Sequence, residues 1–429
     1  MLKAEEYSSE GAPVISAGEI REGYLEIGAK TPRVSSETIE RLPRFLLQEN
    51  DIVFGRKGST HRNALIKKEE EGYFLGSDGI RLRVNGKSIC PRYLSYQLRG
   101  GKAVSWLKSN SEGTTMPSLN QDILSRFPIT LLPIVEQKAI AHILGTLDDK
   151  IELNRKTNET LEAMAKALFQ SWFVDFDPVR AKAEGRSTGL PDEIIDLFPD
   201  SFEDSELGEI PRGWEVVKLG DCSLDIESGK RPKGGIDKNL TFGIPSIGAE
   251  SIAAVGQFDF SKTKWVEATF AESTGKGWIQ NYDVALYKDG GRPGEFRPRM
   301  ALYGDGFPFE KAMVNEHVFL LRSSQLGQPY LYYLFNFDLV LSQIIHKGSS
   351  KGAQPGLNQD EVTTCSFVRP DRRLLDAFNH TMESSIKKQL LLGRECQALS
   401  QVRDTLLPKL ISGELRIPEA EKLLEQAGV

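Results

Sequence analysis

One segment of this 429-residue sequence occurs twice, and such a repeat requires a fold built from two related units. The first copy of the motif consists of Pro117, Leu119, Asn120, Gln121 and Asp122. From residue 117 to residue 355, an offset of 238, it recurs as Pro355, Leu357, Asn358, Gln359 and Asp360. The same offset pairs His142 with His380, Lys150 with Lys388, Leu161 with Leu399 and Leu168 with Leu406. A collinear series of this kind indicates duplication and not chance.

The upstream parts of the two copies are related by a slightly different offset. From residue 13 to residue 245, an offset of 232, Pro13 pairs with Pro245, Ile15 with Ile247, Asp51 with Asp283 and Gly58 with Gly290. We therefore predict two copies of a globular part followed by a long helical part. The predicted boundaries are a first globular domain at 1–135, a helix at 136–180, an acidic linker at 181–212, a second globular domain at 213–371, and a second helix with the C-terminal tail at 372–429.

The opening of the second copy has no counterpart in the first. This copy begins with residues 214–221, and an offset of 232 would place their equivalents before Met1. We therefore expect the first globular domain to be abbreviated at its N-terminus. Three explanations stay open: a start that lies upstream, a naturally shorter domain, or a missing strand that is supplied from elsewhere.

The globular parts contain short β-rich runs, such as residues 51–54 and 317–321, separated by glycine-rich turn signals. They predict an α+β fold, or a mixed α/β one, with a twisted and mostly antiparallel sheet.

The helical parts carry a heptad pattern of apolar residues, which predicts a coiled coil. We expect an intramolecular antiparallel pair, in which Asn154 and Asn158 fix the register. The alternative is that each helix packs against its own globular domain. Pro408 is expected to kink or end the second helix, whereas Ile386 and Leu390 can restore its weaker seam by a local shift. The predicted seam consists of Ile140, Leu144, Leu147, Ile151, Asn154, Asn158, Leu161, Leu168, Trp172, Phe378, Met382, Leu392, Leu399, Leu406 and Leu410.

The charge is distributed unevenly, although the net charge is only −6. Residues 184–215 carry ten acids against two arginines, which is typical of an exposed connection between domains. Residues 79–111 instead carry seven basic residues and no acid. Because exposed charges are screened beyond roughly 10 Å, this local excess can attract phosphate whatever the net charge of the chain. The alternative is a solvated basic face without a partner.

Four segments resemble the specificity subunits of type I restriction–modification enzymes. They are residues 132–137 (Leu-Pro-Ile-Val-Glu-Gln), 167–176, 208–221 and 406–415. The resemblance implies two target-recognition domains that each read one half of a bipartite, asymmetric DNA site. It also implies that the paired helices separate these domains and dock two methyltransferase subunits, which restriction (translocase) subunits join. S-adenosylmethionine, ATP and magnesium are then expected on the partner subunits, and no cofactor on this chain.

Basic loops are the candidates for DNA contact, because Arg and Lys supply phosphate affinity while base edges supply discrimination. The main candidates are the loop at 55–63 and the related loop at 288–297, with Arg299 just beyond it. The alternative for any single residue is an ordinary surface loop. The candidate DNA-binding residues are Arg56, Lys57, Ser59, Thr60, His61, Arg62, Lys108, Ser109, Thr114, Thr115, Lys230, Arg231, Lys288, Arg292, Arg297, Arg299, His346, Lys347, Ser349 and Lys351.

Motifs of enzyme chemistry are missing from the sequence. There is no His-Glu-x-x-His and no Gly-x-Ser-x-Gly, and the segment 85–88 lacks the first glycine of a phosphate loop, because position 81 is Arg. The carboxylates of Asp148 and Asp149 are expected on a solvated helix face. The four cysteines form no Cys-x-x-Cys pair, so we expect neither a metal site nor disulfides.

We therefore expect a non-catalytic DNA-specificity subunit in the cytoplasm, without a membrane segment or a secretory signal. Two other classes of protein stay open: a standalone DNA-modifying enzyme and a coiled-coil scaffold that binds only protein.

Overall fold

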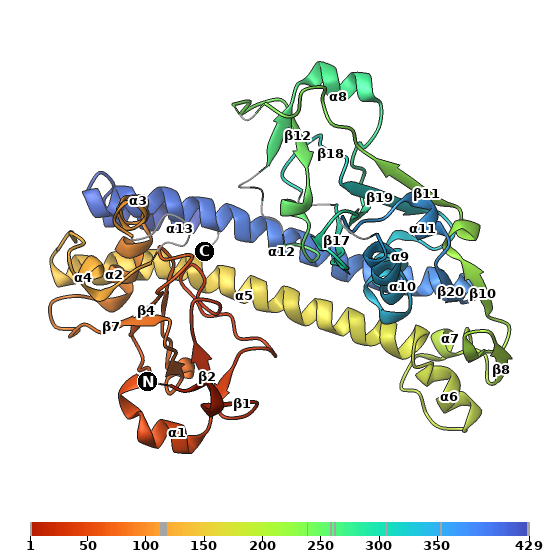
Figure 1. Cartoon of the computed structure of the whole chain (residues 1–429), viewed down its shortest axis with the longest axis horizontal. Coiled ribbons are helices and arrows are strands. Elements are labelled where there is room, and N and C mark those ends of the chain that lie inside the picture. The colour runs from red at the N-terminus through yellow and green to blue at the C-terminus, as the bar shows by residue number, and fades with distance from the viewer. Residues whose placement is uncertain are drawn as a thin grey trace. The chain divides into compact units, whose positions relative to one another are not determined.

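The chain forms two compact units in a computed structural model (Figure 1). The structure describes residues 2–111, 118–237, 239–257, 260, 263–304, 307–351 and 354–426. Unit 1 comprises Met1–Ile151 and Ala398–Val429, and unit 2 comprises Glu152–Gln397. Among the described residues, no helix is long and apolar enough to cross a membrane.

Two long helices contribute to both units. Helix α5 spans Ile134–Phe173 and helix α12 spans Arg372–Ser412. Pro408 was expected to kink or end the second helix, and an end at this residue is wrong, because α12 continues for four more residues. Pro408 is exposed, while Leu406, Leu407 and Leu410 around it are buried, so apolar packing holds the helical turn despite the missing N–H group.

The two helices pair in antiparallel orientation within unit 2. The side-chain amide of Asn158 donates a hydrogen bond to the carbonyl oxygen of Gln389 (3.1 Å). Further along α5, the ring centroid of Phe173 lies 5.1 Å from that of Phe378, which comes earlier in α12. In unit 1, the N-terminal part of α5 contacts the C-terminal part of α12, where Asp148 accepts a hydrogen bond from Arg403 (2.7 Å).

The structure buries most of the predicted seam. Ile151, Leu161 and Leu168 are half-buried, whereas Ile386 and Leu390 are fully buried. The buried seam residues are Ile140, Leu144, Leu147, Asn154, Asn158, Trp172, Phe378, Met382, Leu392, Leu399, Leu406 and Leu410. Each helix also packs on its own globular domain, as the alternative expected, since α5 shares a core with Tyr93 and Tyr96 of α2, and Phe378 of α12 contacts Tyr330 of α9. The C-terminal part of α5 packs on the second globular domain as well, so that alternative alone does not describe the fold.

Unit 1 contains two small sheets, with strand orders β1-β3-β2-β6 and β5-β4-β7. The strands are β1 (Tyr7–Ser8), β2 (Ala12–Ile15), β3 (Arg33–Val34), β4 (Ile52–Gly55), β5 (Asn63–Leu65), β6 (Phe74–Leu75) and β7 (Gly79–Leu82). The helices beside α5 and α12 are α1 (Ser36–Arg41), α2 (Pro91–Arg99), α3 (Gly101–Asn110), α4 (Gln121–Ser125) and α13 (Ile417–Gln426), with short 3-10 helices at Ala4–Glu6, Pro43–Phe45 and Lys68–Glu70.

Unit 2 contains sheets with strand orders β13-β12-β18 and β11-β19-β14-β17, and the pairs β10-β20, β15-β16 and β8-β9. Its strands are β8 (Phe202–Ser205), β9 (Gly208–Pro211), β10 (Glu215–Lys218), β11 (Leu224–Ser228), β12 (Ile244–Ile247), β13 (Lys264–Val266), β14 (Val284–Tyr287), β15 (Gly291–Arg292), β16 (Glu295–Phe296), β17 (Arg299–Leu302), β18 (Met313–Val314), β19 (Val318–Ser323) and β20 (Ser366–Arg369). Its other helices are α6 (Asp177–Ala183), α7 (Asp192–Ile195), α8 (Ala268–Thr274), α9 (Gln328–Asn336), α10 (Asp338–Ser349) and α11 (Gln359–Thr363), with 3-10 helices at Leu219–Cys222 and Ala249–Ser251.

The same pairing pattern occurs in both units, as the repeat predicts. Strand β2 pairs in parallel with β6, and its counterpart β12 pairs in parallel with β18, in the same register. Antiparallel pairs β4·β5 and β4·β7 correspond to β14·β17 and β14·β19. The fold is thus α+β with mostly antiparallel pairing, but each globular domain holds several small sheets and not the single sheet expected.

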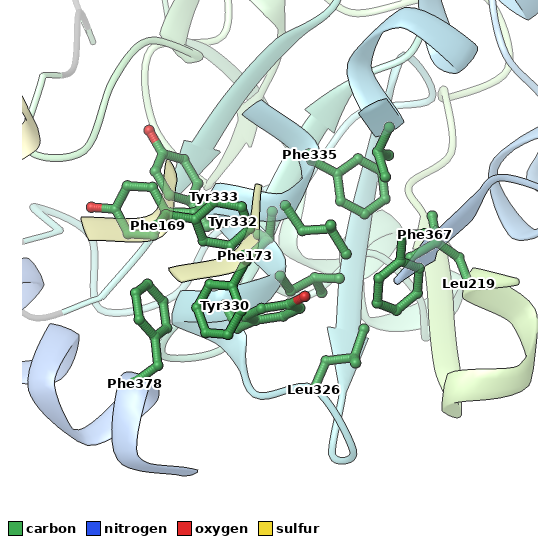
Figure 2. Close-up of a cluster of buried hydrophobic side chains, with 14 of the residues drawn as sticks. Phe169, Phe173, Leu219, Leu326, Tyr330, Tyr332, Tyr333, Phe335, Phe367 and Phe378 are labelled. Carbon is green, nitrogen blue, oxygen red and sulfur yellow. The ribbon is translucent and has the colours of Figure 1, made fainter. Parts of the chain in front are cut away.

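Aromatic side chains form the core of unit 2 where the helices meet the globular domain (Figure 2). Phe169 and Phe173 of α5 contact Tyr330 of α9 and Phe378 of α12, with ring centroids 5.0 to 5.7 Å apart. Tilted and edge-to-face aromatic pairs of this kind stabilise a core beyond their area burial. The second globular domain is therefore fixed firmly onto the helix pair within this unit.

Candidate nucleic-acid interface

The repeated Leu-Asn-Gln-Asp motif forms the start of a short helix in both units. The Oδ1 atom of Asn120 accepts a hydrogen bond from the backbone N–H of Ile123 (2.7 Å), and that of Asn358 accepts one from Glu361 (2.8 Å). Asparagine is a favoured N-cap because its side chain satisfies an N–H group that the helix itself leaves unpaired. The preceding Leu119 is buried, as is its counterpart in unit 2.

The motif also holds the candidate loops in place. The backbone N–H of Leu119 donates to the carbonyl oxygen of Arg56, and that of Leu357 donates to the carbonyl oxygen of Lys288, both at 2.8 Å. Arg56 and Lys288 are equivalent at the offset of 232. Each loop leaves the sheet at the same point, since one joins β4 to β5 and the other joins β14 to β17.

In unit 1, the loop at 55–63 packs against the C-terminal end of α3. The hydroxyl of Thr60 is buried and lies 3.1 Å from that of Ser111, the residue that follows α3. The structure therefore brings the loop together with Lys108 and Ser109, which are exposed in the last turn of α3. Ser59 is half-buried at the loop tip.

The side chains of Arg56 and Lys57 are exposed, and within the described residues neither has a hydrogen-bond or ion-pair partner. These two side chains are free to contact an anion.

The pKa of His61 reflects the positive charge of this loop. Burial lowers the pKa of its imidazole, and the nearby positive charges of Lys108 and Arg62 lower it further. Both effects favour the neutral form of the imidazole. Arg62 is half-buried, and its Nε atom is buried without a partner among the described residues. Thr114 and Thr115, which were also predicted to contact DNA, lie outside the described residues.

In unit 2, the candidate loop contains the hairpin β15–β16 and packs against the C-terminal end of α10. Phe296 is buried, and its backbone N–H donates to the hydroxyl of Ser349 (2.9 Å). Its ring lies against Gly348, where an added Cβ would come within 2.4 Å of it. The structure thus brings Arg292, Arg297 and His346 to one region, all of them exposed.

Several of the cations predicted to contact DNA in unit 2 already form ion pairs or hydrogen bonds within the domain. Lys288 lies 3.1 Å from Asp289, Arg297 lies 2.7 Å from Glu295, and Lys351 lies 2.6 Å from Glu361. Two acids thus offset two of the four cations at 288–299. The remaining two are Arg292, whose side chain has no hydrogen-bond or ion-pair partner among the described residues, and Arg299, whose guanidinium lies 5.0 Å from the ring centroid of Tyr287.

The ammonium group of Lys347 is directed into the domain. It donates to the carbonyl oxygen of Glu361 (3.0 Å) and to the hydroxyl of Thr364 (2.9 Å), which fixes α11 to α10.

The segment after β11 lies close to the same loop. Arg231 is exposed and lies 4.0 Å from Glu316, which also contacts His317. His317 in turn lies 2.9 Å from Asp289 at the start of the loop. Lys230 is exposed and without a partner among the described residues.

The predicted basic segment at 79–111 is less positive than its sequence suggests. Arg83 donates to both carboxylate oxygens of Asp51 (2.5 and 2.6 Å), and Arg92 lies 2.6 Å from Asp149. Arg99 lies 3.1 Å from Asp148. Three of the seven positive charges are therefore paired with acids from outside the segment.

Asp148 does not lie on a solvated face, so that prediction was wrong. It accepts hydrogen bonds from Arg99, Arg403 and the hydroxyl of Tyr96, the last two at 2.7 Å. Burial alone would raise the pKa of Asp148, but the charges of both arginines and these hydrogen bonds outweigh it and lower that pKa. One signal was available: Arg403 interrupts the apolar seam, and a charge at such a position needs a buried partner.

Unit 2 repeats the Asp51–Arg83 pair. Arg322 donates to both carboxylate oxygens of Asp283 at 2.6 Å, and its Nη1 atom also donates to Glu227 (2.7 Å). The offset of 232 pairs Asp51 with Asp283, but their arginine partners were not predicted from the sequence. Within the described ranges, no group of three or more His, Cys, Asp or Glu residues could hold a metal ion.

Two copies of an α+β domain, each followed by a long helix, define a class of tandem two-domain proteins with paired helices. Residues 1–163 match the family model of the type I restriction modification DNA specificity domain.

Curated relatives extend this match over most of the chain. The chain is 27% identical over 355 residues to the type I restriction enzyme MjaIX specificity subunit of Methanocaldococcus jannaschii, which covers 80% of this chain and 73% of the relative. It is 24% identical over 415 residues to the type I restriction enzyme HindI specificity subunit of Haemophilus influenzae, which covers 86% of this chain and 87% of the relative.

A solved structure has the same fold. The type I restriction–modification system S subunit from M. genitalium matches with a TM-score of 0.50 at 16% identity, covering 96% of this chain and 91% of that one. The chain is thus similar to the specificity subunits of type I restriction–modification systems over most of its length.

Proposed function

We propose that this chain is the DNA-specificity subunit of a type I restriction–modification complex and that it reads a bipartite, asymmetric site. The proposal rests on one observation: a basic loop lies at the same point of the fold in both units. In each unit the loop is held by the Leu-Asn-Gln-Asp motif and by the end of the neighbouring helix. Two loops that differ in sequence but lie at equivalent positions suit the recognition of two different half-sites.

The division of labour follows from the chemistry of the loops. The unpartnered side chains of Arg56, Lys57, Lys230 and Arg292 are the best candidates for phosphate contact. Neutral donors and acceptors such as His61 and Ser59 suit base edges in the major groove. Lys347 is a weaker candidate than its sequence position suggested, because its ammonium group already makes hydrogen bonds inside the domain.

On this proposal the chain is non-catalytic and directs other subunits to its site. The partners are double-stranded DNA, two methyltransferase subunits and restriction subunits. S-adenosylmethionine, ATP and magnesium belong to those partner subunits. The names of the curated relatives and the matched family model support the specificity-subunit role in this assignment.

A salt titration tests the contribution of the unit 1 loop. Each phosphate contact contributes roughly 0.9 to the slope of log affinity against log salt. The double variant Arg56→Ala/Lys57→Ala should therefore lower that slope by about 1.8 and weaken binding to all sequences. The matched control is Lys30→Ala/Lys68→Ala, which removes two exposed lysines of unit 1 that lie outside both the loop and the basic segment at 79–111. Equal slopes for the loop variant and the unaltered chain would remove this loop from the interface.

Sequencing of methylated DNA tests the function as a whole. Cells that express the chain with its methyltransferase should carry methylated adenines within one split motif. An exchange of residues 289–298 for another loop should change one half of that motif and leave the other half unchanged. Methylation that does not depend on the chain, or binding to protein alone, would contradict the proposal and favour a scaffold.

A further inference from the structure

Each long helix contains one glycine in its interior, Gly145 in α5 and Gly393 in α12. Glycine is one of the least favourable residues inside a helix, because its backbone loses the most conformational freedom on folding. A glycine at such a position is explained when a neighbouring group approaches the helix too closely to leave room for a Cβ atom. The two glycines therefore indicate where another part of the chain packs directly on the helix.

In unit 2, the group that packs on Gly393 is backbone. A Cβ atom added to Gly393 would lie 2.1 Å from the carbonyl oxygen of Gly256 and 2.8 Å from its Cα atom. Gly256 belongs to the loop that follows the 3-10 helix at Ala249–Ser251, and its φ of +69° favours glycine. A Cβ atom on Gly256 would in turn lie 2.2 Å from the carbonyl oxygen of Gln389. The loop and α12 thus meet through two glycines, with no side chain between them.

Helix α5 contributes to the same contact. The side-chain amide of Asn158 donates to the carbonyl oxygen of Gln389 (3.1 Å), which is the oxygen that Gly256 approaches. Asn158 and Gln389 are both buried. The backbone of the loop therefore lies at the point where the two helices are joined by a buried hydrogen bond.

The hydrophobic core connects this contact to the candidate loop at 288–297. Val255, which precedes Gly256, is buried in the same core as Leu286 of β14 and Phe296 of the candidate loop. Close-packed cores transmit a displacement instead of absorbing it. The contact between Gly256 and Gly393 therefore helps to fix the position of the candidate loop relative to the helices of unit 2.

The glycine of α5 meets a different kind of group. A Cβ atom added to Gly145 would lie 2.5 Å from the Cζ atom of Arg92. Arg92 donates to the carbonyl oxygen of Gly145 (3.1 Å) and to Asp149 (2.6 Å). The end of an arginine side chain can move aside by a change of rotamer, whereas the backbone at Gly393 can move only together with its loop. The two glycines thus provide a test position and a matched control.

We infer that Gly393 is a positioning residue for the half-site that unit 2 reads. It is buried and cannot contact DNA itself, so it acts through Gly256. A methyl group at position 393 would displace the loop by roughly 1 Å to reach ordinary contact distance. Recognition contacts depend on geometry held to within about 0.5 Å, so this displacement disturbs them. The inference rests on the proposed DNA-specificity function.

Binding to scrambled half-sites tests this role. The chain in complex with its methyltransferase is given duplexes that carry the methylated motif of the unaltered chain, either intact or with one half-site scrambled. Gly393→Ala should lower the preference for the intact half-site of unit 2 by about tenfold, the order of one lost base contact. The preference at the other half-site should stay unchanged. The exchange of residues 289–298 identifies which half-site unit 2 reads.

Two variants and a folding measurement separate positioning from a loss of folding. Gly145→Ala meets only the movable end of Arg92 and should keep both preferences. Circular dichroism should show that Gly393→Ala is at least as helical as the unaltered chain, because alanine favours a helix more than glycine does. Asn158→Ala leaves the space at Gly393 free but removes the amide that holds the carbonyl of Gln389. It should give a smaller loss at the same half-site, and it provides the test if Gly393→Ala does not fold.

Two results would overturn the inference alone. One is that Gly393→Ala and the unaltered chain show equal preferences at both half-sites. The other is an equal loss at both half-sites, which would indicate a general loss of binding and not a misplaced domain. An unaltered chain that directs no methylation would instead contradict the proposed function, and the inference with it.

Discussion

At equivalent positions of the helix pair, the two units use different interactions between side chains. In unit 1, the carboxylate of Asp148 lies between Arg99 and Arg403. At the offset of 238, the counterparts of Asp148 and Arg403 are Ile386 and Ala165 in unit 2, and both are buried. An ion-pair network and an apolar contact thus serve the same place in one duplicated fold. The comparison teaches that this framework accepts either solution, provided that each buried charge keeps its partner.

Other contacts are the same in both units. Asp51 and Asp283 each receive two hydrogen bonds from an arginine, and each accepts another from the backbone three residues earlier. Asn120 and Asn358 each cap a short helix. Contacts that define the framework are therefore repeated, whereas the junction with the helices and the loops that face solvent differ.

The largest effect is expected at the aromatic junction of unit 2. Phe169→Ala should lower the free energy of unfolding of unit 2 by about 4 kcal/mol, because it leaves a cavity among packed rings. Its counterpart in unit 1 is Leu407, which already lines a cavity, so Leu407→Ala should cost only about 2 kcal/mol. Hydrogen exchange under native conditions, read separately for each unit, measures both values. Equal costs would mean that the two junctions are packed alike.

The ion pair of unit 1 comes next. Arg403→Ala should lower the free energy of unfolding of unit 1 by about 3 kcal/mol, because it removes one of the two arginines that neutralise the largely buried carboxylate of Asp148. The triple variant Arg99→Phe/Asp148→Ile/Arg403→Ala replaces all three charged residues by their counterparts at the offset of 238, Phe337, Ile386 and Ala165, and should recover most of this loss. Chemical denaturation of the two variants beside the unaltered chain provides the measurement. A triple variant less stable than the single one would show that unit 1 cannot adopt the apolar solution.

Acid should affect this network before it affects its apolar counterpart. The pKa of Asp148 is lowered in the folded chain below its ordinary value of 3.8. Its contribution to stability is therefore fully present above that value and is lost as the pH falls through the lowered folded pKa. Unit 1 should lose this contribution below about pH 4, and Asp148→Asn should remove the corresponding part of the pH dependence. Thermal unfolding from pH 7 to pH 2 tests this, and identical acid profiles for the two chains would contradict it.

The smallest effect tests the equivalence of the two motifs. Asn120→Ala and Asn358→Ala should each cost about 1 kcal/mol, because each leaves a helix N–H without its acceptor. Local hydrogen exchange of residues 121–125 and 359–363 measures the loss. A large difference between the two would show that the motif has separate roles in the two units.

The duplicated fold and the paired helices could be predicted from the sequence because both depend on patterns that are linear in the chain. The offsets of 238 and 232 mark equivalent positions, and a heptad seam marks the face of a helix that is buried. The arrangement of the strands into sheets could be predicted less well. Short strands such as β6 and β18 contain too few residues to show which neighbouring strand they pair with.

The partners of individual charges could not be predicted in this way. Asp148 lies one position past a seam leucine, where the helical period alone indicates an exposed face. It is half-buried because α2 supplies Arg99 and Tyr96 from a distant part of the sequence. Lys347 was predicted to contact DNA for its charge, but the acceptors on Glu361 and Thr364 depend on how α10 and α11 pack. Which loop residues contact DNA stays a prediction.

The hydrogen bonds from Leu119 to Arg56 and from Leu357 to Lys288 fix the root of each loop to the domain that carries it. The root does not depend on side chains of the loop, because only main-chain atoms make that bond. Mutations within the loop can therefore change its exposed side chains without breaking the backbone hydrogen bond that holds the loop to its domain. The half-site that one loop recognises can therefore change during evolution while the other half-site and the framework of both domains stay the same.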